Sequence, residues 1–359
     1  MEFILKSTIK VLGFALYGPL AASTRYRLIQ YESGLSEFGI NLHVCHLLGD
    51  GYLRQRYAGG SLPFAGMLKA GLARFKDILQ QSDYDVVMLY GELFPLMPGW
   101  FERALIRKPY IYDFDDAFYL KYRIGSMSIA KPILGDKFDN VIAGASAVTA
   151  GNRVLAEYAL RNNASTHYLP TAVDTKRYQP AVLGRGSIVF TVGWVGSPST
   201  AAYLLELVAP LSQMGLEGLV KFIVVGAKAP KIPNVSVVEV DWNEFREVDL
   251  INSFDVGVMP LPNDDWARGK CAFKLIQYMA CAVPVIASPV GANVDAVGTD
   301  CGLFATSHRE WLEALRLLRD NPVTRDKMGN AGRLRVEQNY SLHNNLPLLA
   351  SVLRQVEIK

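Results

Sequence analysis

The sequence predicts an α/β protein made of two doubly wound, Rossmann-like domains, and three observations carry that prediction. A chain of 359 residues is longer than one hydrophobic core usually serves, because cores stop growing at about 250–300 residues. Short apolar runs alternate with helical stretches, which indicates parallel strands covered by helices on both faces. This alternation pauses at 174–186 and then begins again.

The first half begins with an apolar run that has two interpretations. Val11–Ala22 resembles a signal peptide, but Gly18 and Pro19 interrupt it, so we interpret the segment as a strand and a glycine loop. The strand-like runs of this half are 9–14, 85–90, 109–112 and 147–150, with a helical stretch at 152–161.

The second half repeats the scheme after a segment that is rich in proline and glycine. Its strand-like runs are 187–193, 220–225, 235–240, 255–259 and 283–287. The intervening 174–186 segment is the best linker candidate. We therefore expect domains over 1–178 and 179–340, followed by a helix over 341–359 that returns to the first domain.

Composition excludes several classes of protein. The 37 basic and 34 acidic side chains leave a net charge of +3, which is too weak to indicate nucleic-acid binding. The four cysteines lie far apart, so neither a disulfide framework nor a structural zinc site is expected, and a reducing cytoplasm fits best. No window has the roughly 18 uninterrupted apolar residues of a membrane-spanning helix.

The turn after the 187–193 strand is a candidate phosphate site. Glycines allow close backbone approach there, and a hydroxyl can cap the following helix, whose N-terminus favours an anion. An ordinary capped turn is the alternative. The residues are Gly196, Ser197, Ser199 and Thr200.

A second basic segment precedes the 283–287 strand. If a helix begins near Gly269, then Lys270, Lys274 and Gln277 share one face, and the two lysines can hold a diphosphate together with Arg268. A solvated surface helix is the alternative interpretation.

Carboxylates and arginines also follow strands of the first half. Asp113, Asp115 and Asp116 end the 109–112 strand, so they face a cleft, a metal ion or arginines, or form a solvated turn. The glycine loop offers a clamp for phosphate or for the acceptor side, although a helix surface would account for the same residues. The clamp residues are Gly18, Thr24, Arg25 and Arg27.

These segments together resemble the retaining glycosyltransferases of family 4, which have the GT-B fold of two facing Rossmann-like domains. The segment FKLIQYMACAVPVIASPVG resembles the family's donor-site signature, and GWVGSPST resembles the first strand, loop and helix of its donor domain. YLPTAVDTKRYQP resembles the family's linker, and IYDFDDAFY stands where many members carry a His-Asp pair.

The resemblance implies that residues 1–178 bind the acceptor and that residues 179–340 bind a nucleotide sugar. The sugar would be moved to a glycan or lipid-linked glycan with retention of its anomeric configuration. Such a reaction would belong to cell-surface polysaccharide synthesis. It implies that Asp241 and Trp242 contact the base, and that Asp115 or Asp116 contacts the transferred sugar. Lysines and backbone N–H groups, Lys274 foremost, would stabilise the leaving diphosphate. No cofactor or metal is then required.

The sequence departs from the family where its two glutamates are expected. Those positions fall near Gly269 and Gln277, so the role of the first glutamate is vacant and Gln277 is left to bind a ribose hydroxyl. A catalytically silent nucleotide-sugar-binding GT-B subunit is therefore one alternative, and an epimerase of the same fold is another. A third is a magnesium-dependent phosphohydrolase with Asp113 as nucleophile and Asp115 as acid.

The helical stretch at 64–79 suggests contact with a membrane. Its apolar face is flanked by Lys69 and Lys76, with Arg54 and Arg56 just before it, so it could lie on anionic lipid or pack on its own sheet. We expect a cytoplasmic protein with weak, peripheral binding to the inner face of the membrane. The apolar residues are Phe64, Leu68, Leu72, Phe75 and Leu79.

Overall fold

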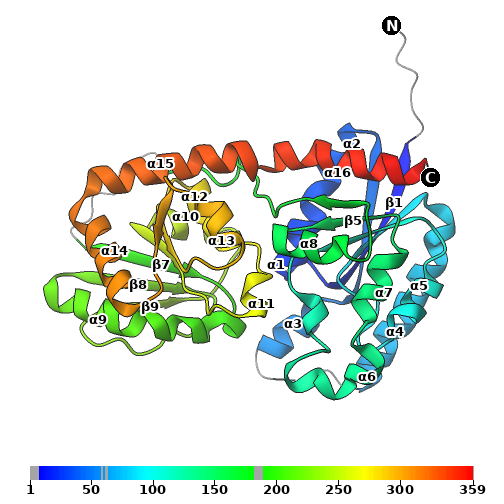
Figure 1. The fold of residues 1–359 in the computed structure, drawn as a ribbon, viewed down its shortest axis with the longest axis horizontal. Helices are drawn as coiled ribbons and strands as arrows, with labels where there is room; N and C mark the ends of the chain where they lie inside the picture. Colours follow the sequence, from blue (N-terminus) through cyan, green and yellow to red (C-terminus); the bar gives the residue numbers. More distant parts are fainter. Residues whose placement is uncertain (1–7, 58–59, 61–63, 182–188, 359) are drawn as a thin grey trace, which may run out of the picture. The chain divides into compact units, whose positions relative to one another are not determined.

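The computed structural model describes residues 8–57, 60, 64–181 and 189–358 (Figure 1). The chain divides into an N-terminal unit, Met1–Thr171 with His343–Lys359, and a C-terminal unit, Ala172–Leu342. Each unit contains one parallel six-stranded sheet with helices on its faces, so the predicted α/β class with two Rossmann-like domains is confirmed. No helix in the described part of the chain is long and apolar enough to cross a membrane.

The N-terminal sheet has the strand order β2-β1-β3-β4-β5-β6. All side chains of its central strands β3, β4 and β5 are buried, as expected of strands covered on both faces. The strands are β1 (Ile9–Tyr17), β2 (Ile40–Leu48), β3 (Val86–Tyr90), β4 (Tyr110–Phe114), β5 (Ala147–Ala150) and β6 (Thr166–Tyr168).

Helices of the N-terminal unit follow the strands, and the C-terminal helix α16 (Leu342–Glu357) joins them beside α2 (Figure 1). Gly34 of α2 lies against Leu346, and Asn345 donates to the carbonyl of Pro170 over 2.5 Å. The other helices are α1 (Ala22–Arg27), α2 (Glu32–Glu37), α3 (Asp50–Tyr57), α4 (Phe64–Leu79), α5 (Gly99–Leu105), α6 (Lys131–Leu134), α7 (Lys137–Gly144) and α8 (Arg153–Leu160), with 3₁₀ turns η1 (Ile29–Tyr31), η2 (Gln80–Asp83), η3 (Phe118–Leu120) and η4 (Gly125–Ala130).

The C-terminal sheet has the strand order β12-β11-β10-β7-β8-β9. Its strands are β7 (Phe190–Val195), β8 (Val220–Val225), β9 (Ser236–Val240), β10 (Val256–Met259), β11 (Val285–Ala287) and β12 (Gly302–Phe304). Its helices are η5 (Pro198–Leu207), α9 (Val208–Glu217), α10 (Glu247–Asn252), α11 (Asp265–Arg268), α12 (Phe273–Ala280), α13 (Ala292–Val297), α14 (His308–Asp320) and α15 (Pro322–Asn339).

Two cores lie on opposite faces of the C-terminal sheet. Trp194 and Trp311 are buried in one with η5, α9 and α14, and Tyr278 is buried in the other with α10, α12 and α15. Gly257 lets Tyr278 approach, since a Cβ atom there would lie 2.3 Å from the Tyr278 ring. Helix α12 is therefore held directly against the sheet next to the loops that follow β7 and β10.

The domain boundary lies earlier than the sequence suggested. Val173 forms a parallel bridge with Ser341, and Tyr178 is fully buried in a core of the C-terminal unit. The start of the expected linker is thus part of that unit, while residues 182–188 lie outside the described residues. The sequence analysis also missed β2, β6 and β12. Strand β2 mixes buried with more exposed residues, and β6 and β12 have only three residues each.

Helix α4 packs on its domain through Arg74 and Ile78, which are buried. Its apolar stripe faces solvent, since Leu68, Leu72 and Leu79 are exposed, and so is Phe75. Packing of the stripe on the sheet, the alternative left open by the sequence, is therefore wrong for these residues; the Phe64 side chain lies outside the described residues.

Candidate functional site

In each sheet the strand order reverses at one point, and ligands of such folds bind at the carboxyl ends of the strands there. In the N-terminal unit the reversal lies between β1 and β3, and in the C-terminal unit between β7 and β10. Most residues singled out from the sequence follow these strands or their neighbours. The two edges are described separately below.

At the C-terminal edge, the loop after β7 is packed too closely for a side chain at Gly196. A Cβ atom at Gly196 would lie 2.3 Å from the Trp194 ring and 2.8 Å from Cε of Lys274. The hydroxyls of Ser197 and Ser199 lie 2.8 Å apart, and Thr200 donates to the carbonyl of Ser197 over 3.2 Å. At Gly196 the loop therefore presents its backbone and has no room for a side chain.

The element after this loop differs from the expected capped α-helix. It is the 3₁₀ helix η5, and no side chain caps its first turn. The hydroxyls of Ser199 and Thr200 are used within the loop instead. A 3₁₀ helix still leaves its first N–H groups without partners inside the helix, so an anion could bind there.

Lys274 comes from the first turn of α12 and reaches the same loop. Its ammonium lies 5.3 Å from the centre of the Trp194 ring, which is a cation–π distance. The helix begins at Phe273 rather than near Gly269, because Ala272 adopts a left-handed φ of 55° that turns the chain just before it. Lys270 therefore precedes the helix and does not share a helical face with Lys274; its ammonium lies 6.0 Å from the Trp266 ring.

Arg268 ends the short helix α11 on the loop after β10. It is exposed and donates to Asn263 over 3.0 Å and to Asp265 over 3.3 Å. Its backbone touches the loop after β11 at Gly291, which has a φ of 53° and where a Cβ atom would lie 2.5 Å from the Arg268 carbonyl. The two loops can meet only because that residue is glycine.

Gln277 lies in a buried hydrogen-bond network that the sequence analysis did not foresee. Its amide donates to the Tyr178 hydroxyl over 2.8 Å, and that hydroxyl donates to Glu247 over 2.5 Å. Trp242 donates its indole N–H to the same carboxylate over 2.7 Å, while Asp241 is exposed. Glu247 is thus the link between Gln277 and the loop after β9. The sequence offered little indication of this network, because Glu247 is simply a glutamate on the first turn of a helix.

A cavity of about 370 Å³ lies at the same edge of the C-terminal unit. It is lined by η5 and by the loops after β10, β11 and β12, and the polar side chains on its wall are those of Tyr203, Glu206, Asn263, Ser288 and Thr306. A volume of this size suits a small organic ligand.

At the N-terminal edge, Asp113 is fully buried and its carboxylate is taken up by other side chains. Arg27 donates to it through both a terminal nitrogen over 2.5 Å and Nε over 2.9 Å, and Thr149 donates over 2.5 Å. Burial alone would lower the pKa of Arg27, but the Asp113 carboxylate more than offsets this and leaves the pKa raised. Arg27 also donates to the carbonyl of Leu169 over 2.8 Å. The expected clamp role of Arg27 is therefore wrong, because its guanidinium is enclosed.

Asp115 has a different environment from Asp113, although only Phe114 separates them. It is partly exposed and accepts a 2.5 Å hydrogen bond from the Tyr90 hydroxyl at the end of β3. Burial raises the pKa of Asp115 to about 6, against the opposing effects of Arg27 and Tyr90. Asp116, also partly exposed, accepts from the N–H of Ala117 over 2.9 Å. Tyr90, Thr149 and Asp50, none of which the sequence singled out, complete this edge.

The remaining clamp residues fold the loop after β1. A Cβ atom at Gly18 would lie 2.6 Å from the Asp50 carboxylate, and that carboxylate accepts from the N–H of Leu20 over 2.8 Å. Thr24 donates to the carbonyl of Tyr17 over 2.9 Å, and Arg25 donates to the carbonyl of Pro19 over 2.6 Å. These contacts give the three positions a structural explanation.

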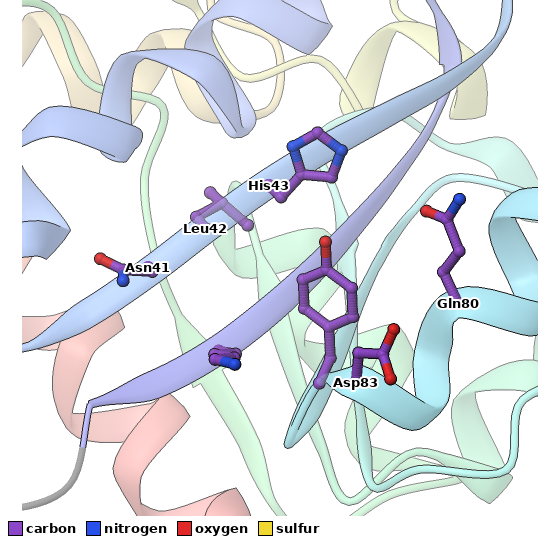
Figure 2. A pocket seen from close by; sticks show the side chains of 7 residues that line it. Asn41, Leu42, His43, Gln80 and Asp83 are labelled. Atoms are coloured by element: carbon purple, nitrogen blue, oxygen red, sulfur yellow. The ribbon is translucent and has the colours of Figure 1, made fainter.

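A second cavity, of about 380 Å³, lies in the N-terminal unit at the opposite end of its strands (Figure 2). Asn41, Leu42 and His43 of β2 and Gln80 and Asp83 of η2 are among the residues that line it (Figure 2). Because Lys10 and Asn41 stand next to the first residues of β1 and β2, this is the amino edge of the sheet. Within the described ranges, no group of three or more His, Cys, Asp or Glu side chains is arranged to hold a metal ion.

Comparison with known proteins agrees with this geometry. Residues 186–321 match the family described as Glycosyl transferases group 1. No curated protein matches the sequence of the chain.

Several solved structures share the fold at low sequence identity. Sucrose-phosphate synthase from Thermosynechococcus elongatus superposes with a TM-score of 0.70 at 16% identity, over 97% of this chain and 99% of that one. HepE from Anabaena, in complex with UDP and glucose, gives 0.69 at 14% identity, over 96% and 99%. WaaG, a glycosyltransferase involved in lipopolysaccharide biosynthesis, gives 0.66 at 15% identity, over 96% and 99%.

The predicted resemblance is therefore confirmed: the chain has the GT-B fold and carries a glycosyltransferase group 1 domain that spans most of its C-terminal unit. On these grounds the protein is a glycosyltransferase.

Proposed function

We propose that this glycosyltransferase moves a sugar from a nucleotide diphosphate sugar, with UDP-glucose as the first donor to test, to a hydroxyl of a glycan or lipid-linked glycan, with retention of configuration. One observation carries the proposal: the Lys274 ammonium lies over Trp194 beside the close-packed Gly196 loop, at the carboxyl edge of the C-terminal sheet. The choice of UDP-glucose draws on HepE, whose structures contain UDP and UDP-glucose.

The donor diphosphate would lie on the Gly196 loop, with Ser197, Ser199 and Thr200 around it. As the bond between the sugar and the diphosphate breaks, negative charge grows on the leaving phosphate. Lys274 would stabilise that charge, assisted by Lys270 and by backbone N–H groups. Lysines suit this role because an ammonium acts as a point charge on phosphate.

The acceptor hydroxyl would attack the sugar on the face that the diphosphate leaves, and its proton would pass to the leaving phosphate oxygen. No strong protein base is then needed. In this mechanism Asp115 or Asp116 contacts the transferred sugar, Trp242 and Asp241 the base, and Gln277 a ribose hydroxyl. Arg268 adds positive charge at the rim.

We propose that the reaction requires neither cofactor nor metal, since Lys270 and Lys274 supply positive charge for the diphosphate. Asp113 is also a poor candidate for a metal ligand or a phosphohydrolase nucleophile, because Arg27 and Thr149 occupy its carboxylate. This environment argues against the phosphohydrolase alternative.

We place the enzyme in cell-surface polysaccharide synthesis, on the cytoplasmic face of the membrane. Arg54, Arg56, Lys69 and Lys76 are all exposed, so α3 and α4 can bring positive charge to anionic lipid. Charge reversal at these four positions should weaken binding to anionic vesicles.

The second candidate is a GT-B subunit that binds a nucleotide sugar without turnover. It is favoured by the glycine at position 269, where the family resemblance calls for a glutamate and where the residue is buried.

A thermal-shift panel of UDP-, GDP-, dTDP- and ADP-sugars tests donor binding, since a ligand at 100 times its Kd stabilises a protein by about 2.7 kcal/mol. Transfer of labelled sugar to membrane extracts, with the anomeric configuration of the product read by NMR, then separates the two candidates. Binding without turnover on any acceptor favours the silent subunit. No binding to any nucleotide sugar overturns the proposal.

A further inference from the structure

Glu247 is a buried carboxylate of the C-terminal unit to which the proposed function gives no role. It lies in the first turn of α10 and is 3% exposed. Trp242 donates its indole N–H to one carboxylate oxygen over 2.7 Å, and the Tyr178 hydroxyl donates to the other over 2.5 Å. A terminal nitrogen of Arg177 lies 4.0 Å away. These neighbours direct hydrogens at Glu247, so its carboxylate acts as an acceptor.

The acceptor role of Glu247 determines the direction of the next hydrogen bond. A tyrosine hydroxyl has a single hydrogen, and Tyr178 gives it to Glu247. The Tyr178 oxygen can then only accept, and it accepts from the amide nitrogen of Gln277 over 2.8 Å. The two halves of a side-chain amide have nearly the same shape and differ in hydrogen bonding. Glu247 therefore sets the orientation of the Gln277 amide through Tyr178.

This orientation leaves the amide oxygen of Gln277 without a protein donor. In the part of the chain that the structure describes, that oxygen accepts no hydrogen bond, and it is not one of the fully enclosed polar atoms that lack a partner. It therefore keeps a small surface open to solvent. An acceptor on an otherwise buried side chain suits a ligand hydroxyl, because its direction is already fixed before the ligand binds.

The network lies beside the loop that carries the proposed diphosphate site. Gln277 comes three residues after Lys274 in α12, so the two side chains lie on neighbouring positions of one helical face. Gly226, which follows β8, has a φ of 84°. A Cβ atom there would lie 2.4 Å from the carbonyl oxygen of Gly196 and 3.3 Å from Cβ of Trp242. The Gly196 loop and the residue held by Glu247 thus pack against the same glycine.

Arg333 of α15 fixes the backbone of the network. It donates to the carbonyl of Ala280 at the end of α12 over 2.6 Å, and also to the carbonyl of Tyr178. The Tyr178 side chain is fully buried in the core that includes α12. Tyr178 is therefore held in place relative to the helix that carries Gln277.

We infer that Glu247 and Tyr178 are positioning residues of the donor site, which direct the amide oxygen of Gln277 toward a hydroxyl of the nucleotide ribose. The inference rests on the proposed function, which assigns a ribose hydroxyl to Gln277, and it adds the groups that orient the amide. It also accounts for the residue type at position 277. A glutamate there would bring a second carboxylate to Tyr178, which has no second hydrogen to give.

Titration calorimetry of the full chain with UDP, 2′-deoxy-UDP and 3′-deoxy-UDP tests the inference. Removal of the contacted hydroxyl should weaken binding to the wild type roughly three- to tenfold. Glu247→Gln should bind UDP only as well as that deoxy analogue, because an amide at position 247 can donate to Tyr178 and allow the Gln277 amide to turn. A merely structural role of Glu247 would weaken binding of all three ligands equally. If the donor panel selects another base, its diphosphate and deoxy analogues replace these probes.

An exchange of the two residue types tests the direction of the hydrogen bonds without any ligand. Gln277→Glu alone should lower the Tm by at least about 2 °C, because two carboxylates then compete for the single hydrogen of Tyr178. In the double variant Glu247→Gln, Gln277→Glu, the amide donates to Tyr178 and Tyr178 donates to the carboxylate. The Tm and the discrimination between UDP and the deoxy analogue should both return toward their wild-type values.

Glu244→Gln is the matched control. Glu244 lies three residues before Glu247 and pairs with Arg177 over 3.0 Å. This variant should discriminate between UDP and the deoxy analogues as the wild type does. Thermal unfolding checks that each variant is folded.

The outcomes separate this inference from the proposed function. Equal binding of UDP and both deoxy analogues by the wild type would overturn the inference and leave the transferase proposal standing. Unchanged discrimination in Glu247→Gln, or a double variant no better than Gln277→Glu, would also overturn it. If the wild type binds no nucleotide sugar of the panel, the proposed function fails and the inference fails with it.

Discussion

The carboxyl edges of the two sheets occupy equivalent positions in two Rossmann-like units, but their charged groups are arranged differently. In the N-terminal unit, Arg27 and Asp113 are enclosed and bonded to each other, and Thr149 completes the group. In the C-terminal unit, Lys274 is partly exposed and lies over the Trp194 ring beside Gly196, where there is no room for a side chain.

This difference distinguishes charged side chains that stabilise the fold from charged side chains that a ligand can reach. A buried pair is costly to break, because removing one partner leaves the other charge without compensation in a low-dielectric interior. Lys274, by contrast, is partly exposed over the Trp194 ring, so an anion can reach it from solvent. The same residue types, arginine and lysine near glycine loops, therefore have opposite roles at the two edges.

The largest effect that the comparison predicts is on stability. Arg27→Met should lower the free energy of unfolding by about 3–5 kcal/mol, because Asp113 is left buried and charged. Urea denaturation measures the loss. Arg25→Met is the control, since Arg25 is only partly buried and donates to loop carbonyls. If both variants lose equally little, the N-terminal pair does not stabilise the fold and the comparison fails.

The second prediction concerns the C-terminal edge. Lys274→Ala should weaken nucleotide-sugar binding and turnover by roughly 10- to 150-fold, which corresponds to ~1.5–3 kcal/mol for a lost charge-assisted contact, with the fold intact. Titration calorimetry with the best donor of the panel measures the change. Lys228→Ala is the matched control, because Lys228 is exposed and pairs with Glu239 in the same unit. Wild-type affinity in Lys274→Ala would refute the donor-site assignment.

The fold and the glycine loop beside Lys274 could be predicted because their signals are local in the sequence. Buried strands such as β3 and β7 are continuous apolar runs, and a glycine that follows such a strand marks a turn. The helix start at Phe273 could not be predicted, because it depends on the left-handed backbone at Ala272, a residue type that rarely adopts it.

The N-terminal edge could not be predicted for a different reason. Arg27 and Asp113 lie 86 positions apart, and nothing local to either residue indicates that they pair. The network of Gln277, Tyr178 and Glu247 joins residues 99 and 69 positions apart in the same way. Contacts over such separations arise from the tertiary fold. The sequence therefore suggested that Arg27 is an exposed phosphate clamp, whereas the structure buries it in hydrogen bonds to Asp113.

The third prediction sharpens the contrast between Asp113 and Asp115. The pKa of Asp115 is raised to about 6 from an ordinary value of 3.8, so its ionisation costs stability. Stability should thus fall as the pH rises from about 4 through about 6. Asp115→Asn should then stabilise the protein at pH 7–8 by about 1 kcal/mol, discounted for partial exposure, with no gain near pH 4.

Thermal unfolding across this pH range measures the effect. Tyr90→Phe should raise the pKa of Asp115 further, because the Tyr90 hydroxyl favours the carboxylate. Asp116→Asn is the control, since an asparagine can still accept from the N–H of Ala117. A stabilisation by Asp115→Asn that is the same at every pH would show that ionisation is not its cause.

The last prediction is the smallest effect, an absence of change. Sugar transfer should be the same in excess EDTA as without it, because the proposed mechanism neutralises the leaving diphosphate with Lys274, Lys270 and backbone N–H groups. Asp113, the first carboxylate of the Asp-x-Asp segment, forms a buried ion pair with Arg27. Only Asp115 and Asp116, which are partly exposed, are then left in this segment to bind a cation. If EDTA abolishes transfer and manganese restores it, a metal neutralises the diphosphate. The carboxylates of the N-terminal edge would then take part in the reaction by binding that metal. The distinction between a structural N-terminal edge and a ligand-binding C-terminal edge would be wrong.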